Sequence, residues 1–411
     1  MINSATIPHA IAKSVATGTA ASRSHWVRVG MVAFCVATLA GCSTVKDWFQ
    51  DDEEKAKAPT ELTEITPAVT VTEIWTADAG KGEDLLGARQ APVVADGRVY
   101  AAAVEGGVHA FDLQTGNPVW SYESDLRLSG GPGVGEGVVA VGSLEGDVIA
   151  LDAVTGAEKW TGKVDNEVIA APTVGMGMVF VRSNDGRVTA FDAATGERRW
   201  FWNHDVPTLS VRGNDAPVLG PGYLFVGNDD GTISALAAQD GRPLWEQVVA
   251  QQEGRTELDR MADIDGTPVL DGTTLLATSF KGQTMAIDAP SGQPLWVSEN
   301  GGPGEVAVAP SVVLVTGLDG AVFGLDKASG GALWQQPGLI RRSTTSPAIH
   351  GEYAVVGDFD GYLHWLNLAT GEFAARTRTG NEVLRAAPVV ADGILIVQDI
   401  EGGLSAYRLG Q

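Results

Sequence analysis

Residues 106–120 read GGVHAFDLQTGNPVW, and the same pattern returns as GDVIALDAVTGAEKW at 146–160 and as GRVTAFDAATGERRW at 186–200. Each copy joins two elements. The first is Gly-x-φ-x-Ala-φ-Asp, where φ is an apolar residue, and the second is Asp-x-x-Thr-Gly-x-x-x-Trp. Self-similarity at a fixed period is typical of repeat architectures, so these units decide the fold.

The first element occurs eight times along the chain. Its leading glycines are Gly106, Gly146, Gly186, Gly231, Gly282, Gly320, Gly361 and Gly402. A proline followed by apolar residues precedes each copy, as Pro92 does the first. The glycines recur at roughly the 40-residue period that is typical of propeller blades.

The composition of one repeat predicts four short strands. Alternating runs such as Val108–Phe111 are typical of half-buried strands. The Asp-x-x-Thr-Gly segment predicts a turn, in which the Asp accepts local N–H bonds and Gly supplies a positive φ. No 3.6-residue periodicity appears, which excludes a helical repeat. The sequence therefore predicts an all-β, eight-bladed β-propeller of four-stranded antiparallel blades over residues 71–411.

The two ends of the repeat array complement each other. The eighth copy stops at Arg408 without a Trp strand, whereas Trp75 in Val71–Trp75 has no earlier strands of its own. We expect this N-terminal strand to complete the last blade and remove the free sheet edges. The seventh copy has Ala375 where Trp is expected. The predicted packing tryptophans are Trp75, Trp120, Trp160, Trp200, Trp245, Trp296 and Trp334.

The N-terminus carries an export signal. Val29–Ala40 is an apolar run preceded by Arg23 and Arg28, too short to span a bilayer but typical of a signal-peptide core. It ends in Leu-Ala-Gly-Cys, which resembles the bacterial lipobox, with cleavage before Cys42 and acylation of that thiol. The alternative is an ordinary secretory signal that happens to contain a cysteine.

The domain prediction follows from this signal. Residues 1–41 form the signal peptide, and the polar residues 42–70 form a flexible, lipid-anchored tether. The other cysteine, Cys35, leaves with the signal, so no thiol remains for a disulfide, a metal or catalysis. Ser43 after the acylated cysteine, in place of Asp, implies sorting to the outer membrane by the same resemblance.

The mature chain is strongly acidic. The segment 1–41 contains three of the 28 Lys and Arg and no Asp or Glu, so the net charge of −23 becomes −26 for the remainder. Such a surface repels phosphate backbones and anionic lipid headgroups, which disfavours nucleic-acid binding. Solubility is the simplest explanation of the acidity, and a basic partner is the alternative.

Two of the connections between blades are longer than most others. Trp120 is followed by Pro132, as is usual for the repeat, whereas Trp200 is followed only by Pro217 and Trp245 only by Pro268. Both insertions join an outer strand to the next inner strand. We therefore expect them side by side on one face, where loops on a rigid scaffold tend to carry function.

The Gly–Asp–Thr–Gly–Trp repeat resembles the tryptophan-docking motif of the quinoprotein dehydrogenases, which use pyrroloquinoline quinone (PQQ). With eight copies behind a lipobox, the chain resembles the BamB family of accessory lipoproteins of the outer-membrane β-barrel assembly machine, over essentially all of residues 42–411. The resemblance implies a non-enzymatic scaffold without cofactor, facing the periplasm. It also implies docking on BamA and assistance to the folding of outer-membrane proteins.

The resemblance also assigns a binding site to the two insertions. Family members contact BamA through a Leu-Ser-Leu-Arg segment and an Asp-x-Asp segment, which correspond here to Leu209, Val211, Arg212, Asp263 and Asp265. Val211 departs from the usual Leu but stays apolar. Leu209 and Val211 would supply apolar anchors and Arg212 a fork of donors. The aspartates would orient Arg212, meet a basic group of the partner or brace the loops.

Two alternatives remain at this stage. A quinoprotein enzyme would need calcium ligands, a base and stacking aromatics. His109, His204, His350 and His364 show no metal-ligand spacing, and we expect them at the surface or between blades. A propeller lipoprotein with another protein or a cell-wall component as its ligand is the second alternative. Arg341 and Arg342 are expected to be solvated.

Overall fold

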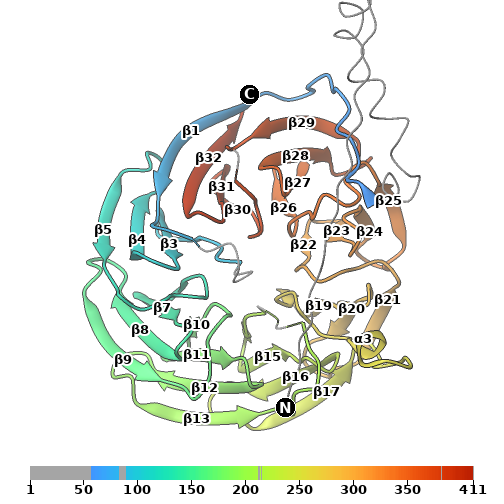
Figure 1. The fold of residues 1–411 in the computed structure, drawn as a ribbon. Coiled ribbons are helices and arrows are strands. Elements are labelled where there is room, and N and C mark those ends of the chain that lie inside the picture. Colours follow the sequence, from blue (N-terminus) through green and yellow to red (C-terminus); the bar gives the residue numbers. More distant parts are fainter. Residues whose placement is uncertain (1–56, 83–88, 212, 214, 381, 411) are drawn as a thin grey trace, which may run out of the picture. The chain divides into compact units, whose positions relative to one another are not determined.

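The computed structural model describes residues 57–82, 89–211, 213, 215–380 and 382–410. The compact unit Pro59–Gln411 consists of eight four-stranded antiparallel sheets that follow one another around a ring (Figure 1). The predicted eight-bladed propeller is confirmed. Within the described residues, no helix has the length and apolar character needed to cross a membrane.

Each of the first seven blades takes its four strands from consecutive sequence. Blade one contains β2 (Val93–Ala95), β3 (Arg98–Ala103), β4 (Gly107–Asp112) and β5 (Pro118–Tyr122). Blade two contains β6 (Gly133–Gly135), β7 (Val138–Gly142), β8 (Asp147–Asp152) and β9 (Glu158–Lys163). Blade three contains β10 (Thr173–Gly175), β11 (Met178–Ser183), β12 (Arg187–Asp192) and β13 (Arg198–Asn203). Blade four contains β14 (Val218–Gly220), β15 (Tyr223–Gly227), β16 (Thr232–Ala237) and β17 (Pro243–Val248).

The second half of the ring repeats this order until the last blade. Blade five contains β18 (Val269–Asp271), β19 (Thr274–Thr278), β20 (Thr284–Asp288) and β21 (Pro294–Ser298). Blade six contains β22 (Ala307–Val308), β23 (Val312–Thr316), β24 (Val322–Asp326) and β25 (Ala332–Gln336). Blade seven contains β26 (Ala348–His350), β27 (Tyr353–Gly357), β28 (Tyr362–Asn367) and β29 (Phe373–Arg378). Blade eight contains β30 (Val389–Ala391), β31 (Ile394–Gln398), β32 (Gly403–Leu409) and β1 (Val71–Asp78).

The antiparallel order gives the ring two distinct faces. The connections from each outer strand to the next inner strand, together with the turns between second and third strands, lie on one side, which we call the loop face. The first and third turns of every blade lie on the other side, the turn face. The second and third strands are buried on both sides, which explains runs such as the five buried residues of β7.

Tryptophans join each blade to the next. At seven junctions the indole Nε1–H of an outer-strand Trp donates to a backbone carbonyl of the following blade over 2.9–3.1 Å. The ring also covers the glycine of that blade's third turn: a Cβ on Gly116, whose φ is +69°, would lie 2.7 Å from the Trp75 ring. Glycine is thus required both for the turn and for the contact. The pairs are Trp75–Gly116, Trp120–Gly156, Trp160–Gly196, Trp200–Gly241, Trp245–Gly292, Trp296–Gly330 and Trp334–Gly371.

The predicted closure is confirmed. Strand β1 pairs with β32 along its length, from Val71 opposite Leu409 to Asp78 opposite Gly403. Trp75 is buried and occupies the same position as the other six docking tryptophans. The two ends of the repeat array therefore form one sheet, and the ring has no open edge at the closure (Figure 1).

Blade seven exchanges the two residues of the docking pair. In the other blades the Trp lies opposite a small residue of the third strand, as Trp120 lies opposite Ala110. In blade seven Trp365 stands on the third strand and Ala375 opposite it on the outer strand. The reason is the closure: β32 and β1 are opposite ends of the chain, so blade eight has no Asp-x-x-Thr-Gly turn to receive an outer Trp.

Trp365 builds the junction between blades seven and eight in another way. It is fully buried and meets the ring of Tyr407 edge-on, with centroids 6.3 Å apart. Its Nε1 donates to His350 Nδ1 at 3.3 Å, and His350 Nε2 donates to Gly393 O of blade eight at 3.0 Å. Burial lowers the pKa of His350, which keeps the ring neutral for these two roles. His350 is thus an inter-blade residue, as expected.

The compact unit begins earlier than the expected boundary at Val71. The compact unit starts at Pro59, and Thr60, Ala68 and Thr70 form backbone hydrogen bonds with the propeller. The last residues of the expected tether are therefore bound to the ring. Cys42 lies outside the described residues, as do the signal peptide and the rest of the tether up to residue 56.

The two adjacent arginines before blade seven differ in their surroundings. Arg341 is exposed, as expected. Arg342 was expected to be solvated, but it is buried and pairs with Asp358 over 2.7 Å. The prediction that Arg342 is solvated is wrong. The buried carboxylate of Asp358, in the turn between β27 and β28, compensates its charge and allows its burial.

Truncation of a docking tryptophan tests the junctions. Trp160→Ala removes a buried ring and its bond to Ala193, and should lower the free energy of unfolding by about 3–5 kcal/mol. The exposed Leu295→Ala on an outer strand is the control and should change it by less than about 0.5 kcal/mol. Urea denaturation of the soluble mature chain measures both. Equal effects would contradict the docking role.

The exchanged pair in blade seven gives a second prediction. Trp365→Ala should destabilise the ring by a similar amount, about 3–5 kcal/mol. Adding Ala375→Trp to that variant should not restore stability, because blade eight offers no turn glycine for an outer ring to cover. The measurement is the same urea titration. Full rescue by Ala375→Trp would contradict this explanation. It would show that the Trp can stand on either strand of blade seven, whether or not blade eight has the turn.

Candidate functional site

The two long connections are neighbours on the loop face. The first, residues 204–217, joins β13 to β14, and the second, 249–268, joins β17 to β18 and contains the short helix α3 (Glu257–Arg260). Val211 N donates to Asp263 Oδ2 at 2.7 Å, and Ala216 N donates to Thr267 Oγ1 at 3.1 Å. The prediction that the insertions lie side by side is therefore confirmed, and they are hydrogen-bonded to each other.

A buried arginine anchors the first insertion. Arg182 on β11 is 4% exposed, and its Nη1 and Nη2 lie 2.7 Å from Asp215 Oδ1 and 2.6 Å from Asp229 Oδ1. Asp215 belongs to the first insertion and Asp229 to the turn between β15 and β16 of blade four. Arg182 thus links blade three, blade four and the insertion between them. A buried charge is tolerated because it is paired on two sides.

Two further carboxylates complete the cluster. Asp263 and Asp265 of the second insertion are 1% and 3% exposed. Arg89 Nη2 lies 3.7 Å from Asp265 Oδ2, and Arg89 Nη1 donates to Pro303 O at 3.2 Å. Residue 89 precedes blade one, whereas Asp265 and Pro303 precede blades five and six. Arg89 therefore spans the mouth of the central channel and reaches the second insertion from the far side of the ring.

Burial governs the ionisation of this cluster. It raises the pKa of Asp215 and of Asp263 to about 7 each, and it also raises the pKa of Asp265. For Arg182 burial acts to lower the pKa, but the charges of Asp215 and Asp229 outweigh it and raise the value. The carboxyls of Asp215 and Asp263 therefore titrate near neutrality, in contrast to exposed carboxyls.

Close packing holds the insertions against the ring. A Cβ on Gly227 of β15 would lie 2.7 Å from both Asp215 Oδ2 and the Ile264 side chain, and a Cβ on Gly213 would lie 2.6 Å from Asp265 Oδ1. Ile264 is completely buried. The second insertion thus places its apolar Ile264 in the core and its two aspartates beneath the surface. Both loops are supported from below by blades three to five.

The residues assigned to the site divide into two groups. Leu209 is 42% exposed and is available to a partner, and Val211 is half-buried and fixed by its N–H to Asp263. Asp263 and Asp265 lie beneath the surface, where their contacts brace the insertions. Arg212 lies outside the described residues. Of the three roles considered for the aspartates, bracing is the one that their position supports.

Sequence reasoning missed the residues that brace the loops. Arg182, Asp215, Asp229 and Arg89 belong to no repeat element. One signal was available: the positions equivalent to Arg182 on the second strands are Ala102, Gly142, Gly227, Thr278, Thr316, Gly357 and Gln398. A charged residue near the end of this strand, where the other blades have uncharged residues, predicts a buried ion pair.

The channel mouth forms a cavity of about 280 Å³ below these loops. Arg89, Asp265, Glu305 and Arg385 provide its charged lining, and small residues such as Ala91 provide most of the rest. Burial raises the pKa of Glu305 to about 7, and Arg89 opposes the shift. No aromatic side chain lines this cavity, and the described residues contain no group of three potential metal ligands. The lining does not fit a stacked quinone with a calcium ion.

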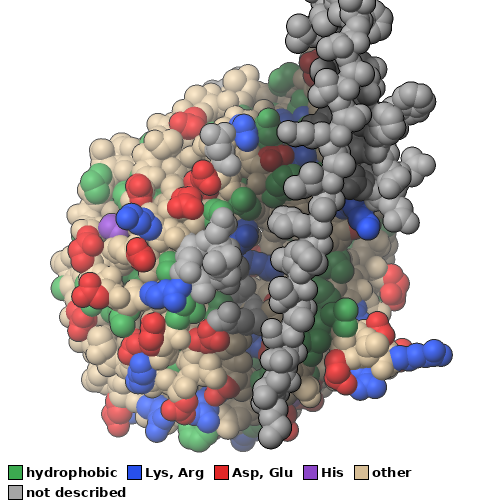
Figure 2. Space-filling model, in the orientation of Figure 1, with side chains coloured by type: hydrophobic (Ala, Val, Ile, Leu, Met, Phe, Trp, Pro, Cys, Tyr) green, Lys and Arg blue, Asp and Glu red, His purple; other side chains and the backbone are tan. Residues whose placement is uncertain are grey.

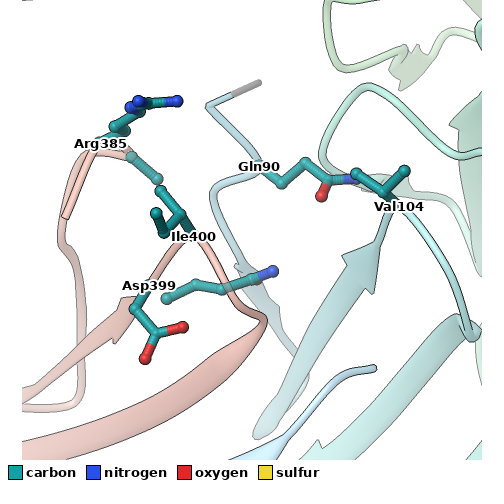
Figure 3. A pocket seen from close by; sticks show the side chains of 7 residues that line it. Gln90, Val104, Arg385, Asp399 and Ile400 are labelled. Atoms are coloured by element: carbon teal, nitrogen blue, oxygen red, sulfur yellow. The ribbon is translucent and has the colours of Figure 1, made fainter. Parts of the chain in front are cut away.

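A second, smaller hollow lies where blade eight meets blade one (Figure 3). It measures about 20 Å³, enough for a single water molecule, and Gln90, Val104 and Asp399 are among the residues around it. Gln398 joins blade eight to blade one, because its Nε2 donates to Ala102 O at 2.8 Å. Gln90 Nε2 donates at 3.0 Å to Leu128 O in the connection from blade one to blade two. The hollow therefore belongs to the packing between blades eight and one.

Charge at the surface is dispersed. On the face in Figure 2, acidic side chains are scattered and interspersed with Lys and Arg. This distribution agrees with the solubility explanation for the negative charge of the chain. Fold and site together define a scaffold of the propeller class, which presents two braced loops on one face.

Comparison with known proteins identifies the family. The family model described as outer membrane protein assembly factor BamB matches residues 61–127, 104–336 and 318–409. Outer membrane protein assembly factor BamB of Xanthomonas campestris pv. campestris is 58% identical over 397 residues, which are 93% of this chain and 98% of the relative. The crystal structure of BamB from Moraxella catarrhalis superposes with a TM-score of 0.75 at 28% identity, and covers 82% of this chain and 100% of its own. The chain belongs to the BamB family of outer membrane protein assembly factors.

The quinoprotein alternative shares only the fold. The quinohemoprotein alcohol dehydrogenase of Comamonas testosteroni superposes with a TM-score of 0.65 at 18% identity, over 82% of this chain and 76% of its own. At that identity the similarity carries no function. The family resemblance stated from the repeats and the lipobox is confirmed, and the assembly factor is preferred over the dehydrogenase.

The pKa shifts in the loop cluster predict a pH-dependent stability. Because the pKa of Asp263 is raised to about 7 in the folded protein, its contribution is fully present below the pKa of the unfolded chain and is lost as pH rises through 7. The free energy of unfolding should therefore fall as pH rises toward 7 and level off above it, by about 2 kcal/mol between pH 5.5 and pH 8 for this group.

Asp263→Asn isolates that contribution. It keeps an acceptor for Val211 N but has no proton to lose, so the fall in stability with pH should be smaller than in the wild type. Asp240→Asn, on an exposed turn of blade four, is the matched control and should keep the full pH dependence. Urea titrations at the two pH values measure the difference. An unchanged pH dependence in Asp263→Asn would contradict the assignment.

Proposed function

We propose that this chain is a non-enzymatic, lipid-anchored subunit of the outer-membrane β-barrel assembly machine. Cleavage before Cys42 and acylation of its thiol would anchor it in the outer membrane, with the propeller in the periplasm. The loop face would dock on the periplasmic domains of BamA and assist the folding and insertion of outer-membrane proteins. Membership of the assembly-factor family supports this proposal.

The observation that carries the proposal is the pair of insertions braced against each other. The two are longer than the connections that precede and follow them around the ring. Two backbone N–H groups of the first insertion donate to side chains of the second, and an ion-pair cluster supports both. Such bracing fixes loop conformation before a partner arrives, which reduces the entropy cost of binding. Leu209 and Val206 are exposed apolar side chains on the first loop, at 42% and 37%, and Arg212 follows Leu209 closely in sequence.

The chemistry of the two residues suits a protein partner. An exposed leucine becomes buried only when another surface covers it, and an arginine beside it offers planar donors to carboxylates or carbonyls. Leu209 and Arg212 would form the centre of the interface, and the surrounding contacts would contribute little binding energy. The acidic cluster below would act indirectly, by holding Val211 and its neighbours in place.

Capture of BamA tests the proposal. Arg212→Ala should weaken binding by about 2 kcal/mol, or roughly thirtyfold, as expected for an interface hot spot. Leu209→Asp should have a similar effect. Arg242→Ala, on an exposed turn of the opposite face, is the matched control and should bind as the wild type does. Pull-down of BamA from solubilised membranes and a titration with its periplasmic domains measure these effects.

The variants must remain folded for the test to count, and urea midpoints equal to that of the wild type establish this. Wild-type capture by both Arg212→Ala and Leu209→Asp would contradict the assigned site. Failure of the wild-type chain to capture BamA at all would contradict the proposed function.

A further inference from the structure

The segment before the first strand is bound along the outside of blade seven. We call residues 60–70 the strap. Thr60 N donates to Ile340 O at 3.1 Å, Ala68 N donates to Ala374 O at 2.7 Å, and Gly410 N donates to Thr70 O at 2.7 Å. Leu62 and Val69 pack against the cores of blades six to eight. The strap therefore has its own polar and apolar contacts at both ends.

Two arginines hold the N-terminal half of the strap. Arg342 Nη1 donates to Thr60 O at 3.3 Å, and Arg376 Nη1 donates to Thr63 O at 2.8 Å. Each arginine binds a main-chain carbonyl, so the clamp depends on the path of the backbone and not on the side chains of the strap. The carbonyls of an irregular segment need such donors, because no sheet partner supplies them.

A buried relay positions both arginines. Asp358 is completely buried, and its Oδ2 accepts from Arg342 Nε at 2.7 Å and from His364 Nε2 at 2.9 Å. His364 was expected at the surface or between blades, but it is completely buried within blade seven, and its Nδ1 accepts from Arg376 Nε at 3.0 Å. Asp360 Oδ2 accepts a further bond from Arg342 Nη2 at 2.6 Å. One buried carboxylate thus orients Arg342 directly and Arg376 through the neutral imidazole.

Burial of the charged groups of the relay costs free energy in blade seven. Buried ion pairs give little net stability compared with an apolar core of the same shape, so a structural role alone is a weak explanation. Blade seven is also the blade in which Ala375 replaces the outer Trp, which leaves room beside the outer strand where Val69 packs. The blade is therefore adapted to receive the strap.

The direction of the strap changes where the N-terminal chain leaves the ring. Strand β1 is the outer strand of blade eight and begins at the turn face. Without a strap, the chain would leave the ring from that face. The strap runs back along blade seven, past Ala374 near the turn face, to Ile340 and Arg342 in a connection of the loop face. The chain therefore leaves the ring at the face that carries the two insertions.

We propose that the strap orients the propeller on the membrane, with the loop face turned toward the lipid anchor. This inference rests on the lipid anchor of the proposed function. Residues 43–58, between Cys42 and Pro59, span at most about 60 Å when fully extended, so the exit point of the chain decides which face can approach the lipid. Release of the strap would lengthen the tether by residues 59–70 and move its attachment to the turn face.

The experiment compares the depth of the two faces in proteoliposomes. The acylated full-length protein is labelled with a fluorophore at Leu318→Cys on the loop face or at Val154→Cys on the turn face, which are 61% and 63% exposed. Nitroxide lipids in the membrane quench whichever label lies closer. We expect stronger quenching at position 318 than at position 154. Equal quenching, or the reverse order, would overturn the proposal.

A strap variant supplies the matched comparison. Replacement of residues 60–67 by Gly and Ser leaves Arg342 paired with Asp358 and Asp360, so the ring keeps its ion pairs. The difference between the two labels should be lost in this variant. Arg376→Gln, which removes one clamp only, should reduce hydrogen-exchange protection in residues 60–66 while Ala68 stays protected. A full label difference in the strap variant would overturn the proposal.

BamA capture in detergent separates this inference from the proposed function. The strap variant should capture BamA as the wild type does, because the insertions are unchanged. Failure of the wild-type chain to capture BamA, together with stronger quenching at position 318 than at position 154, would contradict the proposed partner and leave the strap proposal supported. Absence of acylation at Cys42, detected by mass spectrometry of the purified protein, would overturn both.

Discussion

The contact between an outer-strand tryptophan and the turn glycine of the next blade is the interaction on which the rest of the molecule depends. A propeller blade is a small sheet that cannot bury its faces alone, so its stability comes from its neighbours. Each docking ring covers a glycine, and its indole N–H satisfies a carbonyl of the same turn. Each of these junctions is thereby held by one ring contact and one hydrogen bond. The loop face has a defined geometry only because these junctions do.

The junction without this contact shows what the others require. Blades seven and eight meet where the chain ends meet, and the turn that would hold the receiving glycine does not exist there. Trp365 moves to the third strand, Tyr407 and His350 complete the packing, and the strap fills the outside with Val69. One topological constraint, closure by the N-terminal strand, thus accounts for the exchanged pair, for Ala375 and for the place where the strap binds.

The repeats were sufficient to predict blade number, strand order, closure and the docking tryptophans, since each depends on a local pattern that recurs. Spacing alone placed the two insertions side by side on one face. The bracing of that face was not predictable, because Arg182, Asp215 and Arg89 come from blades three, four and one and meet only in the folded ring. The strap was missed for a similar reason. Its polar sequence is typical of a tether, and the arginines bind its main-chain carbonyls, which leave no pattern in the sequence of the strap.

The proposed function depends on two features of the loop face: insertions that are rigidly braced, and an apolar side chain that they leave exposed. Asp263 and Asp265 are buried beneath the surface, and Asp263 binds the backbone of Val211. The loop that presents the exposed Leu209 is thereby held in place. The same ring fixes the exit of the N-terminal chain relative to that surface. The most direct measurement of the central claim is hydrogen exchange of the tryptophan indole N–H groups by NMR. The seven docking indoles should exchange slowly and lose protection together, at the denaturant concentration that unfolds the whole ring. Loss of protection at individual junctions well before global unfolding would contradict the central claim.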